Sequence, residues 1–155
     1  QTMKQILTIL FLATTTIAYG QTSKQIDSLS FCHNKYKAPT GCKTESEYQL
    51  QCNDYSIQWL YMNDEMLKTM PDQFVSQLEG QMKKFKKEPI TPLLLEKEVN
   101  GYKISFKSDS GTSYQIIAYG IANGQPVLVQ LSLDKEPKTN DDIPEFARQI
   151  VKLTK

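Results

Sequence analysis

Apolar and polar residues alternate along two neighbouring stretches of the chain, residues 48–52 and residues 56–62. A period of two is typical of a strand with one buried face. Ile57, Trp59 and Tyr61 share one face of the second stretch, and an Asn-Asp pair between the stretches favours a turn. The pattern therefore predicts a β-hairpin made of these two stretches.

Residues 21–36, which precede the hairpin, mix polar and apolar positions without a strong period. We expect them to be a partly ordered segment. Residues 37–41 contain a proline and a glycine, which favour a turn because proline fixes φ and glycine permits a positive φ.

The spacing of apolar residues changes to three and four after position 69, which predicts an amphipathic helix. Thr69 is the expected N-cap, and Pro71 suits the first helical turn. The apolar stripe consists of Phe74, Val75, Leu78, Met82 and Phe85. The predicted last turn is crowded with lysines, namely Lys83, Lys84, Lys86 and Lys87. Cations suit the negative end of a helix dipole, so we favour that interpretation of the cluster over an anion or membrane patch.

Apolar and polar residues alternate again in the second half of the chain. The predicted strands span residues 93–98, 102–107, 113–121 and 127–133. The turn signals between them are Asn100-Gly101, Asp109-Ser110-Gly111 and Asn123-Gly124. Such short connections join antiparallel neighbours, so the pattern predicts a meander. A closing helix is expected to begin at Asp142, with Glu145 completing a capping box.

These elements occur in the order ββ-α-ββββ-α. The fold class expected from that order is α+β, an antiparallel sheet flanked by two helices in an arrangement like an α/β/α sandwich. No internal repeat or linker divides the chain. We therefore expect a single α+β domain over residues 21–155.

Residues 1–20 have the three parts of a secretory signal peptide. Lys4 supplies the positive charge, residues 6–13 are apolar, and Ala18 and Gly20 are the small residues before a cleavage site. The apolar stretch is too short to cross a bilayer. We expect cleavage before Gln21, a periplasmic or secreted protein, and no stable membrane insertion after the signal is removed.

Composition narrows the function classes further. The chain has 155 residues, 39% of them hydrophobic and 23% charged, which is typical of a globular protein and excludes collagen-like, disordered and multi-span membrane classes. The formal net charge is +1, so the basic excess expected of a protein that binds nucleic acid is missing.

Three cysteines lie in the predicted mature chain: Cys32, Cys42 and Cys52. An oxidising compartment would allow one disulfide and leave one free thiol. Cys42 and Cys52 flank a predicted strand and are our preferred pair, while Cys32 with Cys42 is nearly as plausible. The alternative to a disulfide is three inert buried thiols. The equal spacing does not resemble a zinc site, which needs closely spaced pairs.

Residues with catalytic chemistry are scarce. His33 is the only histidine, and its neighbour Cys32 would point the opposite way in an extended segment. No nucleophile, phosphate-binding or dinucleotide motif is present. We therefore expect a protein that is not an enzyme, with no catalytic residue, no cofactor and no metal site.

Aromatic residues are concentrated in the predicted strands. Tyr55, Trp59 and Tyr61 lie together on the first hairpin, which carries the only tryptophan. Tyrosine and tryptophan are favoured anchors in protein interfaces, so these three are the candidate partner-binding residues. The alternative is that Trp59 is simply a core residue.

The second half of the chain, from about residue 93, resembles the exported members of the PsbP/Mog1-like group. The resemblance lies in a hairpin, the strand at residues 124–131 (GQPVLVQL) and the closing helix at residues 145–151 (EFARQIV). It implies an α/β/α sandwich with a central antiparallel sheet and an accessory or binding role. It carries no functional residue over to this chain.

The sequence thus favours an exported, non-enzymatic module of the bacterial envelope that binds a protein partner. One alternative is a periplasmic immunity-type protein that neutralises a toxin. A hydrolase or a thiol enzyme is a third hypothesis, and the single histidine disfavours it.

Overall fold

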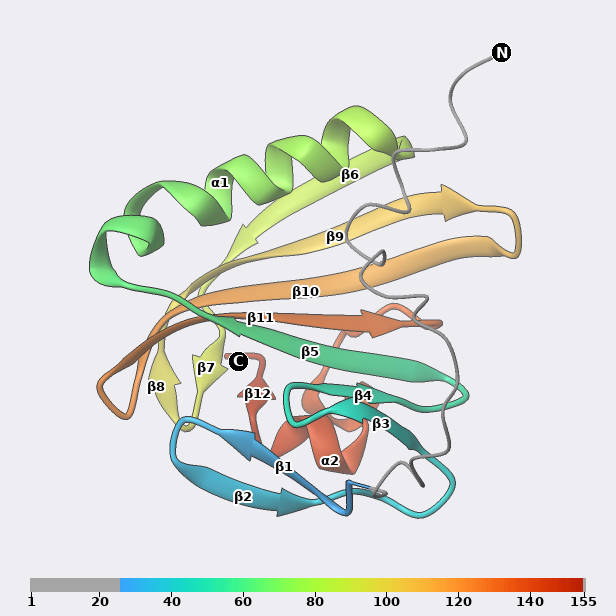
Figure 1. The fold of residues 1–155 in the computed structure, drawn as a ribbon. Coiled ribbons are helices and arrows are strands. Elements are labelled where there is room, and N and C mark those ends of the chain that lie inside the picture. The colour runs from blue at the N-terminus through green and yellow to red at the C-terminus, as the bar shows by residue number, and fades with distance from the viewer. Residues whose placement is uncertain (1–25, 155) are drawn as a thin grey trace, which may run out of the picture.

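The computed structural model describes residues 26–154, so the predicted signal peptide at residues 1–20 lies outside the described residues. A seven-stranded antiparallel sheet forms the centre, in the order β3-β4-β5-β11-β10-β9-β6 (Figure 1). Its strands are β3 (Lys43–Ser46), β4 (Gln49–Gln51), β5 (Tyr55–Tyr61), β6 (Lys83–Ile90), β9 (Asn100–Ser108), β10 (Gly111–Ala122) and β11 (Gln125–Leu133). Strands account for 51% of the described residues and helices for 19%, so the protein is mostly β.

One face of this sheet is covered by a single long helix, α1 (Asp64–Gln81), as Figure 1 shows. The side chain of Asn63 caps the helix by accepting a hydrogen bond from the backbone N–H of Met66 at 2.8 Å. Beneath α1 lies a small core whose buried members are Met62, Val75, Ile104, Ile117 and Leu128.

The opposite face carries the larger core. It is covered by the hairpin of β1 (Ser28–Phe31) and β2 (Asn34–Lys37), by a small second sheet and by short helical segments (Figure 1). The second sheet and the helical segments comprise β7 (Leu93–Leu94), β8 (Lys97–Glu98), β12 (Val151–Lys152), the 3-10 helix η1 (Asn140–Asp142) and α2 (Glu145–Arg148). Large, fully buried side chains of this core include Leu29, Phe31, Leu50, Ile57, Ile116, Leu131 and Ile150.

The expected α/β/α sandwich with the order ββ-α-ββββ-α is therefore wrong. The second face is covered mainly by strands, and α2 is a single turn of four residues. Residues 28–36, expected to be partly ordered, form together with Lys37 a hairpin that covers the larger core. The closing helix is replaced by η1, whose capping box pairs Thr139 with Asp142, followed by α2 and then β12.

The long helix also differs from the prediction at both ends. It begins at Asp64, so Pro71 lies inside it and not in its first turn. Proline is uncommon in a helix interior, which is why the pattern suggested a later start. The helix ends at Gln81, and the lysine-rich segment after it forms strand β6. The interpretation of these lysines as the end of a helix is therefore wrong.

Asn100-Gly101, predicted as a turn, lies inside β9. The turn occurs instead at Leu95 and Glu96, whose φ values are +48° and +66°. Gly101 is needed in the strand because a Cβ atom there would lie 2.4 Å from the backbone oxygen of Ile117.

Other predictions are confirmed. β4 and β5 pair as a hairpin, and β9, β10 and β11 form consecutive antiparallel neighbours. The predicted first strand of the meander, residues 93–98, is wrong, because these residues divide into β7 and β8 of the second sheet. The turn between β10 and β11 falls at Asn123 and Gly124, both with positive φ. Of the helices between residues 26 and 154, none has the length and apolar character that a membrane crossing requires.

Candidate functional site

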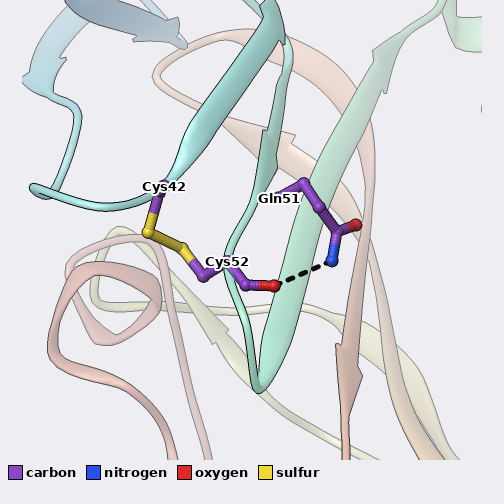
Figure 2. The surroundings of a disulfide bond; sticks show 3 residues. All are labelled: Cys42, Gln51 and Cys52. Carbon is purple, nitrogen blue, oxygen red and sulfur yellow. Dashed lines mark hydrogen bonds between the residues drawn. A yellow bond between two sulfur atoms is a disulfide. The ribbon is translucent and has the colours of Figure 1, made fainter.

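A disulfide joins Cys42 and Cys52, the preferred pair of the sequence analysis (Figure 2). Cys42 comes just before β3 and Cys52 just after β4, so the bond closes the hairpin at one edge of the sheet. The Nε2 atom of Gln51 donates a hydrogen bond to the backbone oxygen of Cys52 at 2.9 Å. Disulfides persist in oxidising compartments, so the bond is consistent with export.

Cys32 is the free cysteine and is buried. It forms the turn between β1 and β2 together with His33, and both residues have positive φ. Its N–H donates to the hydroxyl oxygen of Tyr61 at 2.8 Å, and its carbonyl accepts from Nδ2 of Asn123 at 3.1 Å. Burial raises the pKa of the thiol to about 11, which disfavours the thiolate that a nucleophile requires. His33 is exposed while Cys32 is buried, so their side chains are not arranged as a nucleophile and its base.

We expect the thiol of Cys32 to resist modification in the folded protein. With a pKa of about 11, only about one thiol in a thousand is ionised at pH 8. Reaction with Ellman's reagent should therefore be at least about a hundredfold slower in buffer than in denaturant, where one thiol per chain should react. Rapid reaction of the native protein would show that Cys32 is accessible and ionised.

The aromatic residues of the first hairpin serve the core. Trp59 is 6% exposed, packs edge-on against Phe31 and donates from Nε1 to the oxygen of Ser30 at 3.0 Å. Tyr61 is half-buried and donates to the same oxygen, while Tyr55 is buried. Trp59 is thus a core residue, the alternative that the sequence left open, and this burial counts against the predicted partner contact.

The most suitable binding site lies on the other face of the sheet, in a groove between α1 and strands β5 and β11. The groove has a volume of about 370 Å³. Its principal side chains are Leu60, Gln58, Leu128 and Gln130 from the strands and Met70 and Phe74 from the helix. None of its lining residues is charged, and Leu60 is 49% exposed. We call this site the α1 groove.

A row of glutamine amides crosses the sheet, and two of its members, Gln58 and Gln130, line the α1 groove. Gln58 Nε2 donates to Gln130 Oε1 at 2.5 Å, and Gln130 Nε2 donates to Gln115 Oε1 at 3.1 Å. These bonds fix the three side chains across β5, β11 and β10. Each amide has further hydrogen-bonding capacity, because it carries two N–H donors and an oxygen with two lone pairs.

The chemistry of the α1 groove is therefore that of a binding site. An apolar centre beside fixed amides can hold an apolar side chain and pair with the peptide groups next to it. Across residues 26–154, there is no group of three or more His, Cys, Asp or Glu side chains that could hold a metal ion. A larger hollow of about 830 Å³ beside residues 37–45 is bounded by Ile26, where the described part of the chain begins.

Comparison of the chain with protein-family models and with curated proteins finds no match. The resemblance to the PsbP/Mog1-like group stays a prediction.

The α1 groove was not predicted from the sequence, although one signal of it is present. Leu60 lies on the face of β5 opposite Trp59, where the alternation predicts polar residues such as Gln58. A large apolar residue on such a face is typical of a contact surface. Helix α1 forms the other wall of the groove. Its hydrophobic pattern does not show that it packs beside Leu60.

Proposed function

We propose that this protein is an exported, non-enzymatic module that binds an uncharged, apolar segment of a protein partner in the α1 groove. The observation that carries the proposal is the uncharged lining of the groove around half-exposed Leu60. In a chain with 23% charged residues, ten lining residues without a charge favour a neutral ligand.

The shape of the site supports a side chain as the inserted group. A volume of about 370 Å³ is in the range of small-ligand pockets and can take one or two large apolar side chains. Met70, together with Met62 deeper in the groove, can adjust to inserted groups of different shape. The glutamine amides beside the apolar centre match the hydrogen-bonding groups of a peptide backbone.

The disulfide and the predicted signal peptide support the proposed compartment. A protein with the Cys42–Cys52 bond that is exported from a bacterium would act in the periplasm or outside the cell. An accessory role in an assembly of the envelope fits a small binding module of this kind.

Replacing Leu60 with aspartate should abolish most of this binding. Peptides selected from a random display library by the wild-type protein are expected to be apolar and uncharged. Their affinity for Leu60→Asp should fall by about 10- to 100-fold, because a charge would then stand in the apolar centre of the groove. Fluorescence titration of the selected peptides measures the change.

Ile121→Asp is the matched control, since Ile121 is a 39% exposed aliphatic residue on a neighbouring strand outside the lining of the groove. It should leave peptide affinity unchanged, and both variants should melt near the wild-type temperature. Selection of charged peptides, or equal affinity of wild type and Leu60→Asp, would contradict the proposal.

A further inference from the structure

Lysines gather on the two strands at the β6 edge of the central sheet. Four of them lie in β6, which is an edge strand, and two more lie in its neighbour β9. The lysines are Lys83, Lys84, Lys86, Lys87, Lys103 and Lys107. Because β6 is not a helix end, a helix dipole does not account for them.

The strand register places four of these lysines on one face of the sheet. Lys83 is paired with Lys107, Lys86 with Ser105 and Glu88 with Lys103. Phe106 belongs to the core under α1, so its neighbour Lys107 points to the other face. We call the four residues on that face, Lys83, Lys86, Lys103 and Lys107, the lysine face.

Few carboxylates neutralise the lysine face. Lys103 lies 3.7 Å from carboxylate oxygens of both Glu88 and Glu136. Within residues 26–154, Lys83, Lys86 and Lys107 have no carboxylate oxygen within 4 Å of Nζ.

These lysines of β6 and β9 also include features that destabilise the fold. Like charges directly opposite each other destabilise a strand pair, as in the pairing of Lys83 with Lys107. Lys84 adds a positive φ of 51° at an irregularity in the pairing. Unfavourable features that bring the fold no visible benefit are often found at functional sites.

Protection of a sheet edge explains only part of this arrangement. Lysines on an edge strand prevent pairing with other chains, which accounts for those of β6. β9 is not an edge, because it is paired with β6 on one side and β10 on the other. Ion pairs with Glu88 and Glu136 account for Lys103. Lys107, which stands opposite Lys83, therefore needs another explanation.

We propose that the lysine face binds the anionic headgroups of a lipid membrane surface. Protein interfaces favour arginine and are depleted in lysine, so a patch whose basic residues are all lysines fits a protein partner poorly. Flexible point charges suit mobile headgroups, and lysines near an anionic membrane surface are attracted to it. The formal net charge is only +1, so the attraction arises from the local gathering of charge. This contact is peripheral and independent of the α1 groove.

Sedimentation with lipid vesicles tests the proposal. Protein recovered from an exporting host should bind vesicles of phosphatidylcholine and phosphatidylglycerol in equal parts, and should not bind phosphatidylcholine alone. Added salt should weaken the binding, because it screens exposed charges. The triple variant K83Q/K86Q/K107Q should bind about 100-fold more weakly, because the loss of each lysine should weaken vesicle binding by about fivefold.

K35Q/K37Q/K43Q is the matched control, because it removes the same charge from exposed lysines on β2 and β3. It should bind like wild type, as should K83R/K86R/K107R, and circular dichroism should show that all variants are folded. The proposal is overturned if K83Q/K86Q/K107Q binds like wild type, if wild type binds neither vesicle or both equally, or if soluble polyphosphate or polyglutamate binds more tightly than the anionic vesicles.

Discussion

Replacing Trp59 with alanine should lower the free energy of unfolding by about 3–5 kcal/mol, the range for removing a large aromatic side chain from a core. Trp59 is buried in the larger core against Phe31. The substitution also removes the indole N–H that donates to Ser30 of β1. Urea denaturation measures the change.

Leu60→Ala is the control for that experiment, because Leu60 is the next residue of β5 but points to the other face and is 49% exposed. This substitution should lower the free energy of unfolding by no more than about 1 kcal/mol. If the two variants lose similar amounts of stability, Trp59 does not hold the β1–β2 hairpin against the sheet.

Gly101→Ala should destabilise the protein by about 3 kcal/mol, the upper end of the range for overpacking. The added Cβ atom would lie 2.4 Å from the backbone oxygen of Ile117 and 2.9 Å from Cγ of Pro92. A backbone oxygen in a central strand cannot move aside without disturbing the pairing of β9 with β10. Thermal unfolding of the purified variant measures the loss of stability.

Gly80→Ala is the matched control, since Gly80 lies in α1 and a Cβ atom added there would meet no atom of another element within 4 Å. Alanine is favoured over glycine in a helix, so this variant should gain about 0.5–1 kcal/mol. A Gly101→Ala variant as stable as wild type would show that β9 and β10 can separate at this point without cost.

The sequence predicted those parts of the fold in which hydrophobic period and turn signals agree. The β4–β5 hairpin and the strands around Asn123-Gly124 are of this kind. The pattern did not predict the β1–β2 hairpin, because its turn consists of Cys32 and His33. Neither residue is a turn former, although both have positive φ. The backbone of Cys32 is held there by long-range hydrogen bonds with Tyr61 and Asn123.

Strand β6 was mistaken for helix for a related reason. Phe85 continues the apolar spacing of α1, so the period of the helix runs past its true end. Pairing with β9 decides the conformation there, and that partner is supplied by a later part of the chain. The α1 groove depends on the same tertiary information, because its walls come from separate elements.

The order of the strands also determines when this protein can fold. Strands β5 and β11 are neighbours in the sheet although they are far apart in the sequence, and Tyr55 lies opposite Leu133. A pairing so distant in sequence closes slowly, because the loop entropy is lost before the contact forms. During synthesis, the central sheet cannot be completed until residue 133 has left the ribosome. For a protein exported as we propose, this delay keeps the chain unfolded for longer and gives the export machinery time to engage it before its core closes.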